Sequence, residues 1–430
     1  MANPPSFDPS RARLAGIAAG IGLVAALLFF HGLWRAANPV FDETHYLPAA
    51  RALIALSRPT NIEHPLLGKE LIAAGILMFG EGPLGWRFFS VLSGIAAVLA
   101  VFAIGWQLFH RIRPALVAAL LAMFNFTLFV EARIGMLDGP MAALVLMALA
   151  AMLWAMRARR GAAVLLVLVG GLFGLAAAAK WAAIPYLAMA AMALVITRLR
   201  DSRWQWRSAI GGSGQPHFAG VATPTALILL AVPSLITYFL TFAPAFYYAF
   251  DPMTLAKLVP FQAQMFLEQT KPLASHPYQS PWWSWPLDIR PIWYLYEPVA
   301  GVQRGILMLG NPIIMWGGLV ALGYGLAVGL RERSWSLLAP VLLWTAAYVP
   351  WIIIPKKIGF FYYYYLPSIL ICLAIAAATE SLESKRPCGW PVWSVVAAGV
   401  MFAYFYPIIS ASALDGPDAF AQWMWLPSWP

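Results

Sequence analysis

Charged residues are scarce in this 430-residue chain. Asp, Glu, Lys and Arg make up only 11% of it, whereas 61% of its residues are hydrophobic and its mean hydropathy is +0.73. A soluble domain is usually about 25% charged and about 45–50% apolar. The composition therefore excludes an ordinary soluble domain and indicates a protein that crosses a membrane many times.

Cysteine and internal repeats are also lacking. Cys372 falls in an apolar run and Cys388 in a short basic loop, so the sequence predicts neither a disulfide framework nor a metal cluster. A cleavable signal peptide is not expected, because the run at 14–36 is long enough to span and no small-residue cleavage site follows it. The absence of a repeat argues against the many transporters that are built from duplicated halves.

Long hydrophobic stretches are what the chain has in abundance. A helix needs about 20 apolar residues to cross the hydrocarbon core of a bilayer. Eleven stretches qualify, so we expect an all-α polytopic membrane protein that forms one integral membrane domain over residues 1–430. The expected spans are 14–36, 86–108, 114–132, 139–156, 162–180, 182–198, 220–248, 306–330, 337–355, 360–378 and 391–413.

Positive charge is unevenly divided between the loops. If the N-terminus is cytoplasmic, the inner side carries 15 Lys and Arg against 5 Asp and Glu, whereas the outer side carries 13 of each. Cytoplasmic loops of membrane proteins are enriched in Lys and Arg. The net charge of +10 is therefore explained by topology and does not indicate nucleic-acid binding. We expect the N-terminus inside and the C-terminus outside.

Two of the expected outer loops are long, at 37–85 and 249–305. The first contains an amphipathic stretch at 45–58 that is suited to lie in the membrane interface. The second is rich in Trp, Tyr and Pro at 280–298, and such aromatic residues belong at the level of the lipid headgroups. The same tryptophans are also suited to stack on a sugar, and the composition alone leaves both interpretations open.

The ionisable residues that attract attention all fall on the predicted outer side. They are Asp42, Glu43, His64, Lys69, Glu131, Arg133, Asp138, Lys180, Asp288, Arg290, Lys356 and Lys357. Ionisable groups at membrane depth are costly and usually mark a function. A carboxylate can take a proton from a hydroxyl, and cations can stabilise a phosphate leaving group. This set suits a donor that joins a lipid, a phosphate and a sugar, although anion transport and lipid-headgroup binding suit it too.

Several of these residues also have a purely structural interpretation. Asp42 is suited to cap the helix that follows it. Arg133 and Asp138 are close enough in sequence to pair with each other across a turn. Lys180 and Lys357 are suited to extend toward lipid headgroups.

Eight fragments occur in an order that resembles one enzyme family. They are FDETHY (41–46), HPLLGK (64–69), GWRFFS (85–90), EARIGMLD (131–138), KW (180–181), SPWWSWPLDIRPIWYLYE (280–297), ILMLGNPIIMW (306–316) and KKIGFFYYYYLP (356–367). Together they resemble the dolichyl- or polyprenyl-phosphate-mannose–protein mannosyltransferases, glycosyltransferase family 39, which have the GT-C fold. The resemblance covers about residues 40–378, and its specificity lies in the order of the fragments.

The resemblance implies an inverting transfer of a sugar, mannose, from a polyprenyl-phosphate donor to a Ser or Thr hydroxyl of a protein. It implies a bacterial inner-membrane enzyme whose active site faces outward and which requires no metal. By the same resemblance Asp42 is the catalytic base and Glu43 supports it or orients the acceptor. Arg133, Asp138 and Lys180 are implied to surround the donor, so we expect Arg133 and Lys180 to line one cavity.

Four further residues are expected to contribute to donor binding, namely His64, Lys69, Arg290 and Lys357. Arg290 and Lys357 are matched by neighbourhood rather than by a sharp motif. His64 precedes a proline, and a histidine in this position is more often a structural loop residue than a ligand. We also expect the loop at 249–305 to cover the site, with its tryptophans at the interface and Arg290 turned inward.

The chain departs from the family in one region and leaves alternatives open. Eukaryotic members carry a large lumenal domain in the loop after the seventh span, whereas here that loop has only 57 residues, at 249–305. This indicates a short bacterial form and leaves the acceptor open. A GT-C transferase that acts on a lipid or glycan, similar to the lipid A aminoarabinose transferase, is an alternative, although the soluble C-terminal domain of that enzyme is not expected after residue 413. A transporter or a lipid-binding protein is the third.

Overall fold

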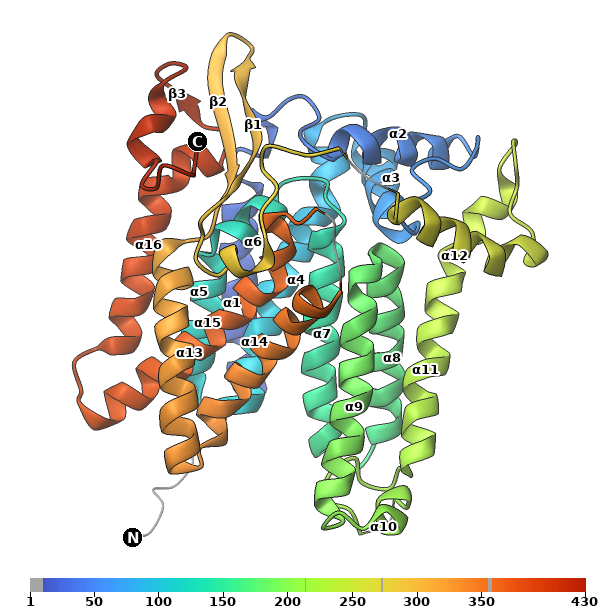
Figure 1. Ribbon diagram of the computed structural model, residues 1–430, viewed down its shortest axis with the longest axis vertical. Coiled ribbons are helices and arrows are strands. Elements are labelled where there is room, and N and C mark those ends of the chain that lie inside the picture. The colour runs from blue at the N-terminus through green and yellow to red at the C-terminus, as the bar shows by residue number, and fades with distance from the viewer. Residues whose placement is uncertain (1–10, 213, 272–273, 355–357) are drawn as a thin grey trace.

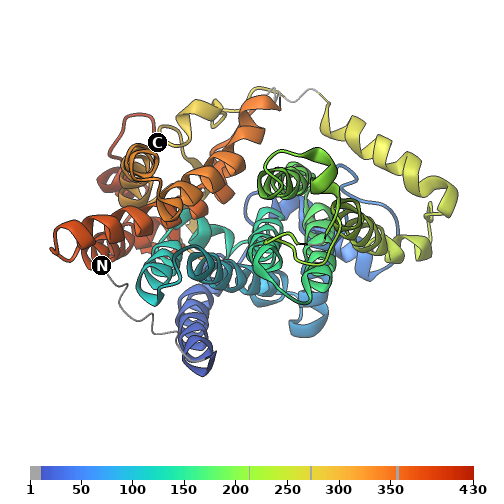
Figure 2. The same ribbon diagram turned by 90° about the horizontal axis from the view of Figure 1, so that it is seen from below.

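The computed structural model describes residues 11–212, 214–271, 274–354 and 358–430. Long helices run side by side through the molecule, and shorter helices and a β-hairpin gather at one end of them (Figure 1). Seen from below, α13 to α16 form one group of helices and α7, α8, α9 and α11 form another, with α4 and α5 between them (Figure 2).

Within the described residues, ten helical segments are long and apolar enough to cross a membrane. The segment that contains α15 is central, because 94% of its most apolar 18-residue stretch is buried. The segment that contains α1 is peripheral, because only 17% of the corresponding stretch is buried. The helices of these segments are α1 (Arg11–Phe30), α4 (Pro83–Phe109), α7 (Asp138–Arg157), α8 (Ala162–Ala179), α9 (Ile184–Asp201), α11 (Thr223–Leu240), α13 (Pro312–Glu332), α14 (Trp335–Ile353), α15 (Tyr365–Lys385) and α16 (Trp390–Ile409).

The structure differs from the eleven predicted spans at one stretch, 114–132. It contains two helices in series, α5 (Ile112–Met123) and α6 (Phe126–Glu131), each too short to cross a bilayer alone. Asn125 separates them, because its side chain accepts a hydrogen bond from the Thr127 amide at 3.0 Å and so caps α6. Hydropathy does not register this division, since one polar residue barely changes the average over the stretch.

The two long outer loops contain most of the remaining structure. The first holds α2 (Glu43–Ile54), which overlaps most of the predicted amphipathic stretch at 45–58, and α3 (Leu67–Phe79). The second holds α12 (Leu255–Gln269) and an antiparallel hairpin. Short helices complete the chain: α10 (Trp206–Ile210), η1 (Leu33–Arg35), η2 (Trp181–Ala183), η3 (Ala243–Tyr247), η4 (Trp282–Ser284), η5 (Phe361–Tyr364) and η6 (Ala419–Trp423).

A small sheet is the main departure from the all-α prediction. β1 (Ile292–Val299) pairs with β2 (Val302–Met308), and β2 pairs with β3 (Ala413–Leu414) near the C-terminus. The predicted span 306–330 includes residues 306–308, which the structure places in β2 instead. β1 and β2 form a local hairpin, but hydropathy alone does not distinguish a short apolar run such as 306–308 from part of a helix. The pairing of β2 with β3 joins residues about a hundred positions apart, and a local pattern does not reveal it.

The charged loops meet at two opposite ends of the bundle. At one end, Glu380 accepts ion pairs from Arg111 and Arg113 at 2.5 and 2.8 Å, and Lys385 pairs with Glu332 at 2.7 Å. All five residues belong to loops that were predicted to be cytoplasmic. The opposite end carries α2, α3, α12 and the hairpin (Figure 1). The candidate site lies at this second end.

Candidate active site

Asp42 stands at the entrance to α2. It occupies the N-cap position, but its side chain makes no capping hydrogen bond. Instead its Oδ2 accepts a hydrogen bond from the Tyr46 hydroxyl at 3.2 Å, one turn further along the helix. The preceding residue, Phe41, has a left-handed φ of 49°, which turns the chain sharply into the helix. Burial raises the pKa of Asp42, and the positive charge of Lys180 and the Tyr46 hydrogen bond oppose this shift.

Lys180 brings a buried positive charge to the same region. It caps the C-terminal end of α8, where a cation interacts favourably with the helix dipole. Its Nζ lies 2.6 Å from Oδ2 of Asp138, in the first turn of α7, where a carboxylate is favoured for the same reason. The Nζ also lies 5.3 and 5.9 Å from the ring centres of Tyr362 and Tyr363 in η5. The start of α7, the end of α8 and the distant η5 therefore meet at one ammonium group.

Glu131 adds a third carboxyl group beside Asp42 and Asp138. It ends α6, is fully buried, and its Oε1 accepts a hydrogen bond from the Tyr294 hydroxyl at 2.8 Å. Tyr294 lies on β1 and stacks on the Phe41 ring at 4.2 Å. Burial, and then the negative charge of Asp138, raise the pKa of Glu131. The hairpin is thus held against the site by contacts on both sides of Tyr294.

This arrangement has a definite chemical capacity. A half-buried carboxylate at Asp42 can accept a proton from a hydroxyl that arrives from water. The cation at Lys180 can stabilise an anion that develops next to it. The tyrosine rings of η5 offer flat apolar surfaces beside both groups. Among the described residues no group of three His, Cys, Asp or Glu is placed to hold a metal ion, and the prediction of a metal-independent reaction stays a prediction.

Glu43, expected to support catalysis, has a structural environment. It is fully buried, and Arg87 binds both of its oxygens, each at 2.7 Å. The same oxygens accept hydrogen bonds from the amides of Val40 at 2.8 Å and Gly135 at 2.6 Å. With four donors on two oxygens, Glu43 holds segments together, so we do not carry it forward as a group that touches substrate.

Arg133 does not join Lys180. Its Nη1 donates to the carbonyls of Phe29 and His31, at 2.9 and 2.5 Å, which lie at the C-terminal end of α1. Carbonyls at the C-terminal end of a helix lack hydrogen-bond donors within the helix, and the Arg133 guanidinium supplies them. Arg133 does not pair with Asp138 either, since Lys180 occupies that carboxylate. The expectation that Arg133 and Lys180 line one cavity is corrected: the turn sends Arg133 toward α1 and Asp138 toward α8.

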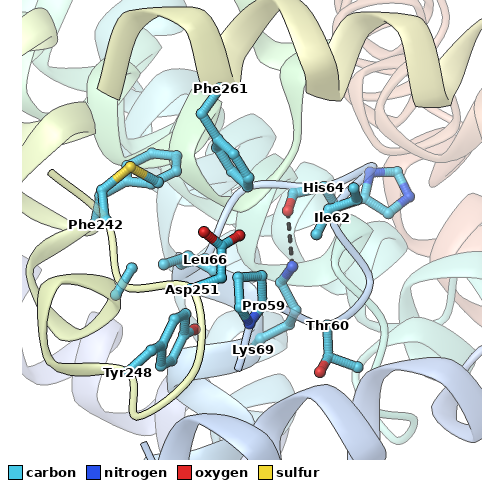
Figure 3. A pocket seen from close by; sticks show the side chains of 12 residues that line it. Pro59, Thr60, Ile62, His64, Leu66, Lys69, Phe242, Tyr248, Asp251 and Phe261 are labelled. Carbon is cyan, nitrogen blue, oxygen red and sulfur yellow. Dashed lines mark hydrogen bonds between the residues drawn. The ribbon is translucent and has the colours of Figure 1, made fainter. Parts of the chain in front are cut away.

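His64 and Lys69 belong to the loop beside Asp42, and Tyr46 links His64 to Asp42. The His64 ring packs edge-on against Tyr46, with 6.0 Å between the ring centres. Lys69 is 1% exposed, and its Nζ donates to the carbonyls of Asn61 and His64, each at 2.7 Å. Lys69 therefore stabilises the outer loop, and its amine is not a ligand of the Lys180–Asp138 ion pair. Both His64 and Lys69 line a cavity (Figure 3).

Arg290 is not turned toward the site as expected. Its guanidinium donates to the carbonyls of Pro277, Ser428 and Pro430, at 3.0, 2.5 and 2.9 Å. It thereby fixes the C-terminal segment to the second outer loop. Lys357 lies outside the described residues, so the expectation for it remains a prediction.

The tryptophans of the second outer loop divide into two kinds. Trp282 and Trp283 are 40% and 54% exposed, as expected of residues at an interface, whereas Trp285 is 2% exposed. Trp285 packs edge-on against Trp351 and Tyr363, at 6.2 and 5.9 Å. Because Tyr363 also lies against Lys180, this loop supports one wall of the site, and the hairpin further along it covers another.

Residues that line the site were missed although their fragments had been recognised. They are Phe41, Tyr46, Tyr294, Tyr362 and Tyr363, whereas Glu131 was noted among the ionisable residues and given no role. A signal existed for Tyr46, because it is four residues after Asp42 and so shares its face of a helix. For Tyr294 no local signal exists, because the hairpin that carries it is folded back over the site by long-range contacts.

The fold defines the class of protein. Over 98% of this chain and 93% of the other, it matches the Saccharomyces cerevisiae protein O-mannosyltransferase Pmt1–Pmt2 complex bound to the sugar donor, with a TM-score of 0.81 and 14% identity. It also matches ArnT from Cupriavidus metallidurans in the apo state, over 93% of this chain and 77% of the other, with a TM-score of 0.59 and 15% identity. The protein is a polytopic membrane protein with the GT-C glycosyltransferase fold.

Sequence comparisons identify the family within this class. The family model described as dolichyl-phosphate-mannose-protein mannosyltransferase matches residues 63–212, and that of the C-terminal four TMM region of protein-O-mannosyltransferase matches residues 254–429. The polyprenol-phosphate-mannose–protein mannosyltransferases of Mycolicibacterium smegmatis and Mycobacterium tuberculosis are each 25% identical. The alignments cover 99% and 97% of this chain, and 95% and 91% of those proteins. The chain belongs to the protein O-mannosyltransferase family, which confirms the resemblance.

Proposed function

We propose that this protein transfers mannose from a polyprenyl-phosphate donor to a Ser or Thr hydroxyl of a protein. The names of its relatives support the donor and the acceptor. The observation that carries the chemistry is the half-buried carboxylate of Asp42 beside the buried ammonium of Lys180. We further propose that the reaction occurs on the outer face of a bacterial inner membrane, because the loops on the side of Asp42 lack the excess of Lys and Arg over Asp and Glu that marks the loops at the other end.

The transfer proceeds by a single displacement. Asp42 accepts the proton of the acceptor hydroxyl as its oxygen attacks the anomeric carbon of mannose. The bond between that carbon and the phosphate oxygen breaks, and polyprenyl phosphate leaves with the electron pair. Attack from the side opposite the leaving group inverts the anomeric configuration. The products are the O-mannosyl protein, polyprenyl phosphate and a proton on Asp42.

Lys180 and its surroundings are suited to the leaving group. Phosphate gains negative charge as the bond breaks, and a pre-positioned cation stabilises that charge at no cost of reorganisation. Asp138 keeps the ammonium in place through their 2.6 Å contact. Tyr362 and Tyr363 limit the access of water around Lys180, which favours the acceptor hydroxyl over hydrolysis.

The test uses purified protein, polyprenyl-phosphate mannose labelled in the sugar, and a peptide with one Thr. Asp42→Asn keeps the shape but removes the base, so transfer to peptide should fall by about 10²- to 10⁴-fold while donor binding survives. Asp415→Asn, which neutralises an exposed acid away from α2, is the matched control and should leave transfer unchanged. Near-normal transfer by Asp42→Asn would remove Asp42 from the mechanism.

A lipid or glycan acceptor is the second candidate. An undecaprenyl phosphate-alpha-4-amino-4-deoxy-L-arabinose arabinosyl transferase of Pseudomonas fluorescens is 34% identical over 24% of this chain. The same assay separates the two candidates when membrane lipids are included. Label that stays in the lipid extract and never reaches peptide would favour this second function.

A further inference from the structure

A cavity that the transfer mechanism does not use lies between the first outer loop and α12 (Figure 3). One side is formed by residues 59–69 and the other by the segment that follows α11. Phe261 of α12 points into it from above. Gln269, at the end of α12, donates to the Glu63 carbonyl at 2.6 Å, which ties the helix to the loop. The cavity is therefore a built feature of this end of the molecule.

The cavity has an apolar floor and a polar rim. The floor is made by four buried side chains, Leu66, Phe242, Ala245 and Met253. The rim includes Thr60 and His64, which are partly exposed, and Asp251, whose side chain is 72% exposed and pairs with Lys257. A small apolar hollow with a polar, water-facing edge fits a side chain that is delivered from water on a polar backbone.

Lys69 does not make the cavity an anion site. Burial lowers the pKa of Lys69 to about 7, so a large share of the side chain is a neutral amine near neutral pH. A neutral amine has two N–H groups, and the carbonyls of Asn61 and His64 accept one each, at 2.7 Å. The amine is satisfied by the loop itself and demands no charged occupant.

The cavity is connected to the catalytic acid by two contacts. The His64 ring on its rim lies 6.0 Å from the Tyr46 ring, and the Tyr46 hydroxyl lies 3.2 Å from Asp42. An extended chain advances about 3.3 Å per residue. A hydroxyl held at Asp42 and a side chain held in the cavity therefore belong to residues within about four positions of each other.

We propose that this cavity, which has a volume of about 20 Å³, is an acceptor subsite that takes one small apolar side chain, of the size of the Ala methyl group, from an extended protein segment. That residue lies within about four positions of the Ser or Thr that receives the sugar. The proposal rests on the proposed function, because it assumes a protein acceptor. It makes the enzyme selective for sequence around the hydroxyl as well as for the hydroxyl itself.

The experiment measures KM and kcat for a series of peptides that contain one Thr in a Ser and Gly background. Ala is placed in turn at each position from four before to four after the Thr, and then replaced by Leu, Phe and Asp at the best position. We expect one position at which Ala lowers KM by about tenfold or more, which is the usual discrimination of an apolar pocket. Phe and Asp at that position should lose the advantage.

The Phe261→Ala variant should use some peptides better than wild type, and a misfolded protein would not show such an improvement. Removing this ring enlarges the cavity, so peptides with Leu or Phe at the best position should improve about tenfold relative to wild type. Phe266→Ala is the matched control, because Phe266 lies on the same helix and is 57% exposed away from the cavity. Donor KM and the slow hydrolysis of donor should be unchanged in both variants.

Three results would overturn the proposal. The first is a wild-type KM that is the same for every peptide. The second is a Phe261→Ala variant whose KM changes for the donor and not for the peptides, which would show that the cavity binds the lipid. The third is wild-type enzyme that consumes donor and glycosylates no peptide, which overturns the proposed protein acceptor and this subsite with it.

Discussion

Two neighbouring acids in the FDETHY segment, Asp42 and Glu43, have opposite environments. Glu43 is fully buried and receives four hydrogen bonds, whereas Asp42 is half-buried and receives one from Tyr46. Consecutive side chains at a helix start diverge by about 100°, since the helix has 3.6 residues per turn. One acid therefore faces the core and its neighbour faces the site, and the two are not interchangeable.

The pH dependence of transfer should report the environment of Asp42. A base works only when deprotonated, so activity is lost as pH falls through its pKa, which burial has raised above the ordinary 3.8. The Tyr46 hydrogen bond lowers that pKa, because it favours the charged carboxylate. Tyr46→Phe should therefore move the acid limb of the kcat/KM profile to higher pH.

The control for this measurement is Tyr247→Phe, because Tyr247 is 74% exposed and distant from Asp42 in the described contacts. Its profile should coincide with that of wild type. An acid limb that stays in place in Tyr46→Phe would show that a group other than Asp42 titrates in the rate-limiting step.

At the scale of elements, a single ion pair joins the segments around the site. Arg87 of α4 donates to the carbonyls of Leu33 and Ala36, at 3.1 and 2.7 Å, while it binds Glu43 of α2. Glu43 in turn holds the amide of Gly135, just before α7. The η1 segment after α1, the start of α2, α4 and the turn before α7 thus share one hydrogen-bonded centre that is shielded from water.

Removing one member of this pair should destabilise the protein. Glu43→Gln leaves the Arg87 guanidinium buried without its counter-ion, and breaking a buried pair in this way typically costs about 3–5 kcal/mol. Thermal unfolding in detergent should show a clear fall in Tm. Glu81→Gln, which breaks the exposed pair with Arg51, should cost no more than about 1 kcal/mol. A Glu43→Gln protein of normal Tm that has lost transfer would return Glu43 to the chemistry.

At the scale of the whole molecule, the charged loops at one end contact one another and the site residues meet at the other. Arg200 lies 4.9 Å from the Trp335 ring, which joins the last turn of α9 to the first turn of α14. The site end contains the aromatic loop and the hairpin (Figure 1). This separation supports the proposed orientation, in which the acceptor meets Asp42 outside the cell.

Labelling of single cysteines in intact cells tests the orientation. Cys388 is exposed in the basic loop before α16, so it is a natural reporter for the inner side. A membrane-impermeant maleimide should leave the wild-type Cys388 unmodified. It should react with Ser275→Cys, an exposed position in the second outer loop, in a Cys388→Ser background. The reverse pattern would invert the topology and place Asp42 in the cytoplasm.

The sequence by itself determined the membrane class and most of the spans. These features follow from local composition, because a bilayer demands about 20 apolar residues per crossing wherever they occur. The ordered fragments also identified the family and singled out Asp42, Asp138 and Lys180, which the structure brings into one region. Their meeting was predictable because each stands at the outer end of a span.

Only the tertiary structure decided which partner each polar group takes. Arg133 and Asp138 are five residues apart, yet one serves the end of α1 and the other binds Lys180. Glu43 pairs with Arg87. Tyr294, which lies on a hairpin that local patterns did not predict, donates a hydrogen bond to Glu131. A buried polar group must find a partner, but the sequence does not say which one. That choice depends on contacts between residues far apart in the chain, and these exist only once the helices have packed.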